Sequence, residues 1–96
     1  MMTMVGVVKT ENASSYLRKL CQHWSHKFAV EYTDHAGTIA LPGTKCALEA
    51  SAMELTIRLD VDAGGDVARM QQVVEEHLQR FGFKEELVFL WTPVEE

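Results

Sequence analysis

Six short stretches of the chain are rich in apolar residues, and several of them alternate apolar with polar positions, as in β-strands that bury one face. The clearest stretch covers residues 54–60, where Leu55, Ile57 and Leu59 share one face and the other face is polar. Turns rich in Gly, Pro, Asp and Ser separate the stretches. We expect strands over residues 3–9, 28–32, 38–41, 45–49, 54–60 and 87–91, with Pro93 stopping the last one.

Two longer stretches repeat apolar residues at helical spacing instead. We expect the first helix to begin after the capping residues around Asn12 and to run to about Lys27. The second should begin after Asp66, which caps it, and end at Gly82. The apolar stripe of the first helix is Tyr16, Leu17, Leu20 and Trp24, and that of the second is Val67, Met70, Val74, Leu78 and Phe81.

This order of elements, β-α-β-β-β-β-α-β, predicts an α+β fold formed by one domain over residues 1–96. Short turns between the middle strands indicate a mostly antiparallel sheet. Because each helix has one apolar stripe, both should pack on the same face of the sheet, which is the plan of helix-grip and TBP-like folds. The open face would then carry Glu31, Glu49, Thr56 and Arg58.

The composition, 47% hydrophobic and 24% charged, is typical of a globular protein. A formal net charge of -5 argues against nucleic acid or an anionic membrane as a partner, since both need a basic surface. It favours a small molecule, a metal ion or a protein partner, and a homodimer through an edge strand or the open sheet face is compatible with each. The first residues lack a secretory signal and no apolar run approaches membrane-spanning length, which predicts a cytoplasmic protein.

The densest group of reactive side chains is the stretch CQHWSHK at residues 21–27, within the first expected helix. Helical rotation separates Cys21 from His23 by about 160°, so the thiol and the first imidazole diverge. His23 and His26 would share one flank and could bind a transition metal ion if another element supplied a third ligand. The alternative is a solvated histidine pair beside Lys19 and Lys27, whose charges disfavour an added cation.

His77 lies within the apolar stripe of the second expected helix, where an imidazole needs a hydrogen-bond partner. One interpretation is a satisfied core histidine. The other is that it faces His23 across the helix interface as a metal ligand or proton-transfer partner, so that the ligand set would be His23, His26 and His77.

The same stretch, followed by HLQRF at residues 77–81, Glu85-Glu86 and Trp91, resembles the bacterial domain-of-unknown-function family DUF2218 over nearly the whole chain. The family pattern is Cys-x-His-aromatic-x-His-Lys in the first helix and His-Leu-x-Arg-Phe in the second. Some relatives are associated with siderophore-interacting flavin reductases, which implies a link to iron or other metal handling. The matched positions imply a site at His23, His26, Lys27, His77, Arg80 and Glu86.

Our first hypothesis is a non-enzymatic accessory or binding protein that holds a partner or a metal ion near the three histidines. The second is a module that binds an apolar small molecule in a groove between the helices and the sheet, which requires a cavity of roughly 300 Å³ or more. Its lining would be Tyr16, Trp24, Phe81 and Trp91.

A third hypothesis is an enzyme that uses a histidine and a thiol. It requires Cys46 to approach His23 or His77. The alternative is that Cys21 and Cys46 stay reduced and pack in the core as small apolar side chains.

Overall fold

The computed structural model describes residues 2–82 and 84–94. Its elements follow the predicted order. They are β1 (Met2–Lys9), α1 (Ala13–Trp24), β2 (Val30–Tyr32), β3 (Ala36–Leu41), β4 (Thr44–Ala50), β5 (Glu54–Val61), α2 (Val67–Phe81) and β6 (Leu90–Val94).

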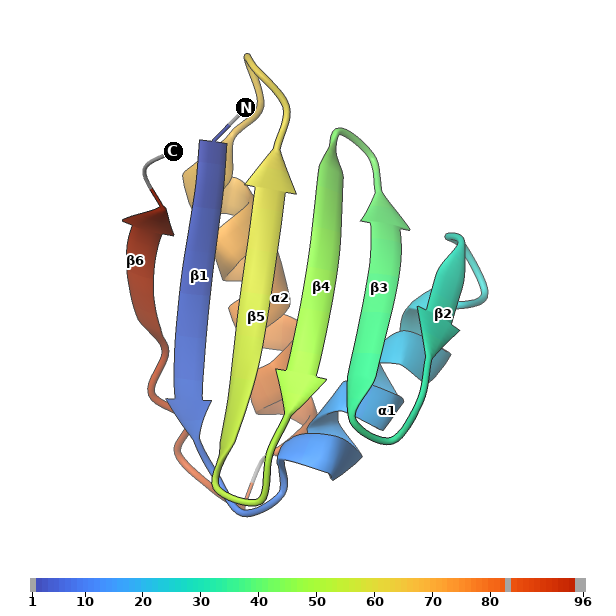
Figure 1. The fold of residues 1–96 in the computed structure, drawn as a ribbon, viewed down its shortest axis with the longest axis vertical. Helices are drawn as coiled ribbons and strands as arrows, with labels where there is room; N and C mark the ends of the chain where they lie inside the picture. The colour runs from blue at the N-terminus through green and yellow to red at the C-terminus, as the bar shows by residue number, and fades with distance from the viewer. Residues whose placement is uncertain (1, 83, 95–96) are drawn as a thin grey trace.

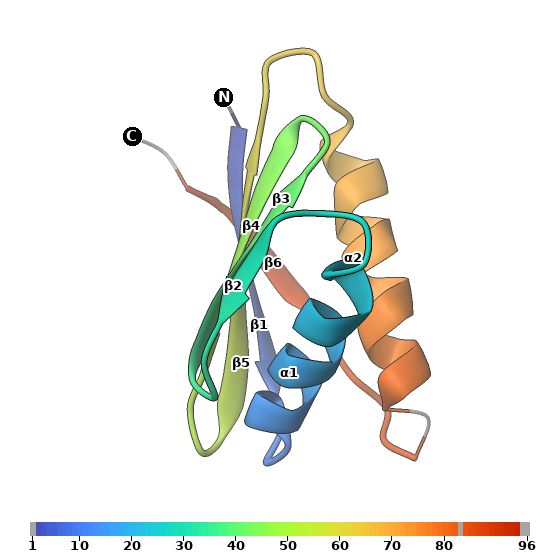
Figure 2. The same ribbon diagram turned by 90° about the vertical axis from the view of Figure 1, so that its right-hand side faces the viewer.

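Within these described residues, the strands form one antiparallel sheet in the order β2-β3-β4-β5-β1-β6. Figure 1 views the open face of this sheet, and Figure 2 shows both helices packed on its other face. The predicted α+β arrangement is therefore confirmed. Strands β2 to β5 are neighbours in sequence, whereas β1 and β6 come from distant parts of the chain and pair with Gly6 opposite Trp91.

The core lies between the sheet and the helices. Every second residue of β5 points into it, and Leu55, Ile57 and Leu59 are each at most 1% exposed. The predicted stripe of α1 is buried as expected, and Cys21, which follows Leu20 of that stripe, is fully buried as well. On the open face, Glu31, Glu49 and Arg58 are exposed and Thr56 is half-buried beside Glu49.

Helix α2 has the predicted bounds. Asp66 caps its start, because its side chain accepts a hydrogen bond from the Arg69 backbone N–H at 3.0 Å. Among the described residues of this helix, only Val74 and Leu78 are fully buried, and the other stripe residues are half-buried. Neither helix of the described chain is long and apolar enough to cross a membrane.

The first helix ends earlier than predicted, at Trp24 rather than near Lys27. The Trp24 carbonyl accepts from the backbone N–H groups of both Lys27 and Phe28, at 3.0 and 2.9 Å, which closes a turn. The chain must reverse here because Val30 pairs with Ile39 in the sheet. His26 consequently lies in this turn, and the shared helical flank that we expected for His23 and His26 does not form.

The last strand is also shifted from the predicted 87–91 to Leu90–Val94, and Pro93 lies inside it opposite Met4. Proline is tolerated there because β6 is an edge strand whose outer N–H groups need no partner in the sheet. Leu87 is unavailable to the strand, since its backbone N–H donates to the Gln79 side-chain oxygen at 3.0 Å.

Glu85, in the segment after α2, forms hydrogen bonds with residues in and just before α1. The hydroxyl of Tyr16 donates a short hydrogen bond to its carboxylate, and the Thr10 hydroxyl donates to the same group at 3.1 Å. The hydrogen bond from Tyr16 is the main reason why the pKa of Glu85 is lowered, while burial followed by the contact with Glu85 raises the pKa of Tyr16 to about 12.

Replacing Tyr16 by Phe should lower the free energy of unfolding by about 1 kcal/mol at neutral pH, a modest value because Glu85 is only half-buried. A carboxyl whose pKa is lower in the folded protein stabilises the fold above its unfolded pKa, and this contribution disappears as the pH falls through the folded value. The difference from the wild type should therefore shrink below pH 4.5, the ordinary value for Glu85.

Urea unfolding at several pH values measures this difference. The exposed Tyr32 provides the matched control, since Tyr32→Phe should leave the stability unchanged. A Tyr16→Phe effect that is the same at pH 3 and pH 7 would contradict the role given to Glu85.

Candidate functional site

The structure brings together two of the histidines singled out in the sequence. His23 lies in the last turn of α1 and His77 in the third turn of α2, and their ring centroids are 5.3 Å apart with the planes inclined at 52°. The two imidazoles face each other because both helices are buried against the same core. The buried side chains nearby are Leu20 and Trp24 on α1 and Val74 and Leu78 on α2. The imidazoles thus flank the line along which the helices meet.

His77 has a defined tautomer. Its Nδ1 lies 2.7 Å from the carbonyl oxygen of Val73, and a carbonyl only accepts, so Nδ1 carries the proton. Neutral His77 therefore has an unprotonated Nε2. The ring also lies 4.9 Å from that of Trp24, which is 5% exposed, so one face of the imidazole contacts the apolar core.

Burial and nearby positive charge lower the pKa of His23, and burial is the larger cause. The contributing charged or titratable groups are His77, Arg80, Lys27 and His26. Because all of these groups are cationic when protonated, the surroundings of His23 favour its neutral form.

A cleft of about 440 Å³ opens beside the histidine pair, between the end of α1, the first half of α2 and the β3–β4 turn. We call it the histidine cleft. Its apolar part includes the Trp24 ring and the Phe28 ring, which meet edge to face at 6.4 Å. The complete lining is His23, Trp24, His26, Lys27, Phe28, Leu41, Pro42, Met70, Val73 and His77.

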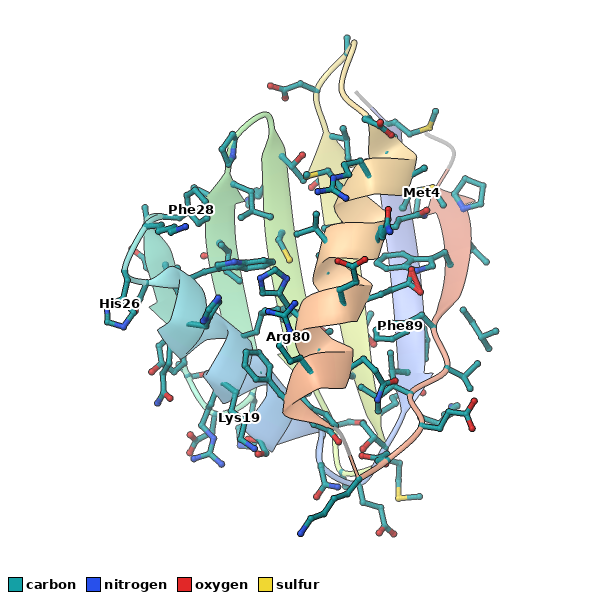
Figure 3. All side chains as sticks on the ribbon, turned by 180° about the vertical axis from the view of Figure 1, so that it is seen from behind. Met4, Lys19, His26, Phe28, Arg80 and Phe89 are labelled. Carbon is teal, nitrogen blue, oxygen red and sulfur yellow. The ribbon has the colours of Figure 1, made fainter. Side chains whose placement is uncertain are left out.

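The other residues of the expected site are not grouped as closely with the His23–His77 pair. His26 and Lys27 contribute to the edge of the histidine cleft from the turn after α1, and Figure 3 shows the His26 ring directed outward from the molecule. Arg80 is exposed on the side of α2 that faces α1. Glu86 is exposed in the segment between α2 and β6 and does not line the cleft.

The metal site remains a sequence-based prediction. In residues 2–82 and 84–94, no three His, Cys, Asp or Glu side chains are grouped so that they could hold a metal ion. The two facing imidazoles of His23 and His77 would thus need further ligands from outside the described side chains.

The thiols are unsuited to nucleophilic chemistry. Cys21 and Cys46 are free and fully buried. Burial raises the pKa of Cys21 to about 11, and burial followed by the neighbouring Cys21 raises that of Cys46 to about 12. Both remain thiols at neutral pH and pack as small apolar side chains.

The expected lining of a groove between helices and sheet is correct only for Trp24. Tyr16 and Phe81 instead line a separate hollow near Glu85, and Trp91 packs over Gly6 toward the other edge of the sheet. Pro42 was not expected to line a cleft. The Pro42-Gly43 pair predicts a turn, but the sequence does not indicate that this turn lies near α2.

A larger hollow of about 740 Å³ lies across one end of β3, β4 and β5. Its charged lining is mixed, with Lys45 among Glu31, Asp60 and Asp62. It contains no aromatic side chain and no histidine among the described residues. The histidine cleft is therefore the stronger candidate, because apolar rings and convergent polar groups occur together there.

Comparison with known proteins agrees with the fold. The family model DUF2218, described as an uncharacterized protein conserved in bacteria, matches residues 5–92. The NMR structure of PA4090 from Pseudomonas aeruginosa is 38% identical, each chain is covered completely, and the TM-score is 0.81. No curated protein matches the chain.

Proposed function

The chain belongs to the DUF2218 family, and from that premise we propose that it acts as a binding module for a small apolar molecule held in the histidine cleft. The observation that carries this proposal is the cleft itself, which is lined by aromatic and aliphatic side chains together with a few polar groups. Ligand sites in proteins have this composition.

The size of the cleft supports a small ligand. About 440 Å³ lies within the range of roughly 300–1,000 Å³ that small-molecule sites occupy. Trp24 and Phe28 offer ring faces and edges, and Met70 offers a flexible side chain that adapts to the shape of a ligand.

The proposal assigns binding and not turnover. Both thiols are buried and protonated, which argues against covalent catalysis through cysteine. A connection with iron or siderophore handling, which the family resemblance implies, gains no support from the described side chains, since they offer two facing histidines and no third ligand.

Titration with N-phenylnaphthylamine, an uncharged fluorescent probe, tests the proposal. We expect bound probe to show enhanced emission and to shift the NMR signals of the cleft residues. Val73→Phe, which fills the cleft with a larger side chain, should weaken binding by roughly tenfold or more.

Val88→Phe is the matched control, because Val88 is 62% exposed and lies outside the cleft. It should bind the probe as the wild type does. Absence of probe binding, or equal affinity in Val73→Phe and the wild type, would reject the histidine cleft as a ligand site.

A further inference from the structure

The polar side chains that line the histidine cleft are all basic. Among the described residues, its lining contains no carboxylate, whereas the chain as a whole has a net charge of -5. Basic side chains therefore converge on this cleft against the overall charge of the protein. They are His23, His26, Lys27 and His77.

Two of these groups, His23 and His77, form a pair on facing helices. Their ring centroids lie 5.3 Å apart, and the Trp24 ring lies 4.9 Å from that of His77. Nδ1 of His77 donates to the Val73 carbonyl, which orients the ring and leaves Nε2 as the nitrogen available to a ligand.

From this geometry, and resting on the proposed function, we propose that the ligand carries one oxyanion, a carboxylate or sulfonate, which binds beside the His23–His77 pair. The anion supplies the negative charge that the lining of the cleft lacks, and the basic side chains attract it.

Every element packed around the pair is consistent with an anion at this position. The end of β3 contributes Leu41 and the β3–β4 turn contributes Pro42, and neither carries a charge. The other facing groups are all basic: His77 and Arg80 on α2 and His26 and Lys27 after α1.

The test compares two probes of similar aromatic shape, anilinonaphthalene sulfonate, which is an anion, and uncharged N-phenylnaphthylamine. The sulfonate should bind roughly tenfold more tightly, as one charge-assisted hydrogen bond predicts. Because the protein is acidic overall, such a preference reports the local charge of the cleft and not that of the whole surface.

Fluorescence titration near neutral pH gives the affinity of each probe. His77→Gln should lower the affinity ratio of the probes toward one. His23→Gln, on the other helix, should reduce the ratio too, and circular dichroism checks that both variants are folded.

His35→Gln is the matched control, because His35 is an exposed histidine outside the cleft. It should behave as the wild type. If the neutral probe binds but the sulfonate binds no more tightly, the anion inference is wrong and the proposed function stands. If neither probe binds in the cleft, the proposed function itself fails.

Discussion

Replacing Leu78 by Ala should lower the free energy of unfolding by about 2–5 kcal/mol, the usual cost of truncating a buried leucine. Leu78 is completely buried, and with Val74 it forms the fully buried part of α2 among the described residues. The helix therefore depends on few side chains for its attachment to the sheet. Urea unfolding followed by circular dichroism measures the loss.

Leu90→Ala is the matched control, because Leu90 is 61% exposed and loses the same atoms. It should change the stability by about 0.5 kcal/mol or less. We also expect Leu78→Ala to weaken binding of N-phenylnaphthylamine, since α2 carries one wall of the histidine cleft. Equal stability of the two leucine variants would contradict the packing described for α2.

Replacing Gly6 by Val should destabilise the protein by about 1–3 kcal/mol, the usual cost of overpacking. A Cβ atom at Gly6 would lie 2.7 Å from Cε3 of the Trp91 ring, closer than two carbon atoms can approach. The indole covers this glycine because Gly6 and Trp91 are paired residues of β1 and β6.

A double-mutant cycle separates this clash from a general effect of valine in the strand. In a Trp91→Leu background the smaller side chain leaves room, so Gly6→Val should cost less than in the wild type. Thermal unfolding of the four proteins gives the coupling. Additive effects of the two substitutions would show that the indole does not restrict position 6.

The parts of the fold that depend on local pattern could be predicted from the sequence. Alternation identified β5, and helical spacing together with Asp66 and Gly82 gave both ends of α2. The end of α1 was wrong because it depends on the pairing of Val30 with Ile39, and β6 was misplaced because a proline is allowed there only by its position at the sheet edge.

Part of the candidate site also follows from local pattern and could be predicted from the sequence. Helical rotation separated Cys21 from His23 and indicated His77 as a candidate to face the first helix, and the structure places the imidazoles of His23 and His77 together. The sequence pattern could not reveal that Leu41 and Pro42 complete a cleft beside them, since those residues come from the end of β3 and the turn that follows it. The location of that turn relative to α2 depends on the whole sheet.

The pairing of β1 with β5 and β6 also bears on how the chain reaches this structure. Met4 is paired with Leu59 of β5 on one side and with Pro93 of β6 on the other, so the strand that is made first has the strand that is made last as one of its neighbours. Such long-range pairing carries a large loop-closure entropy and slows folding relative to local contacts. During synthesis, the second edge of β1 therefore has no partner until β6 has been made, whereas the β2–β5 meander joins its strands through short turns.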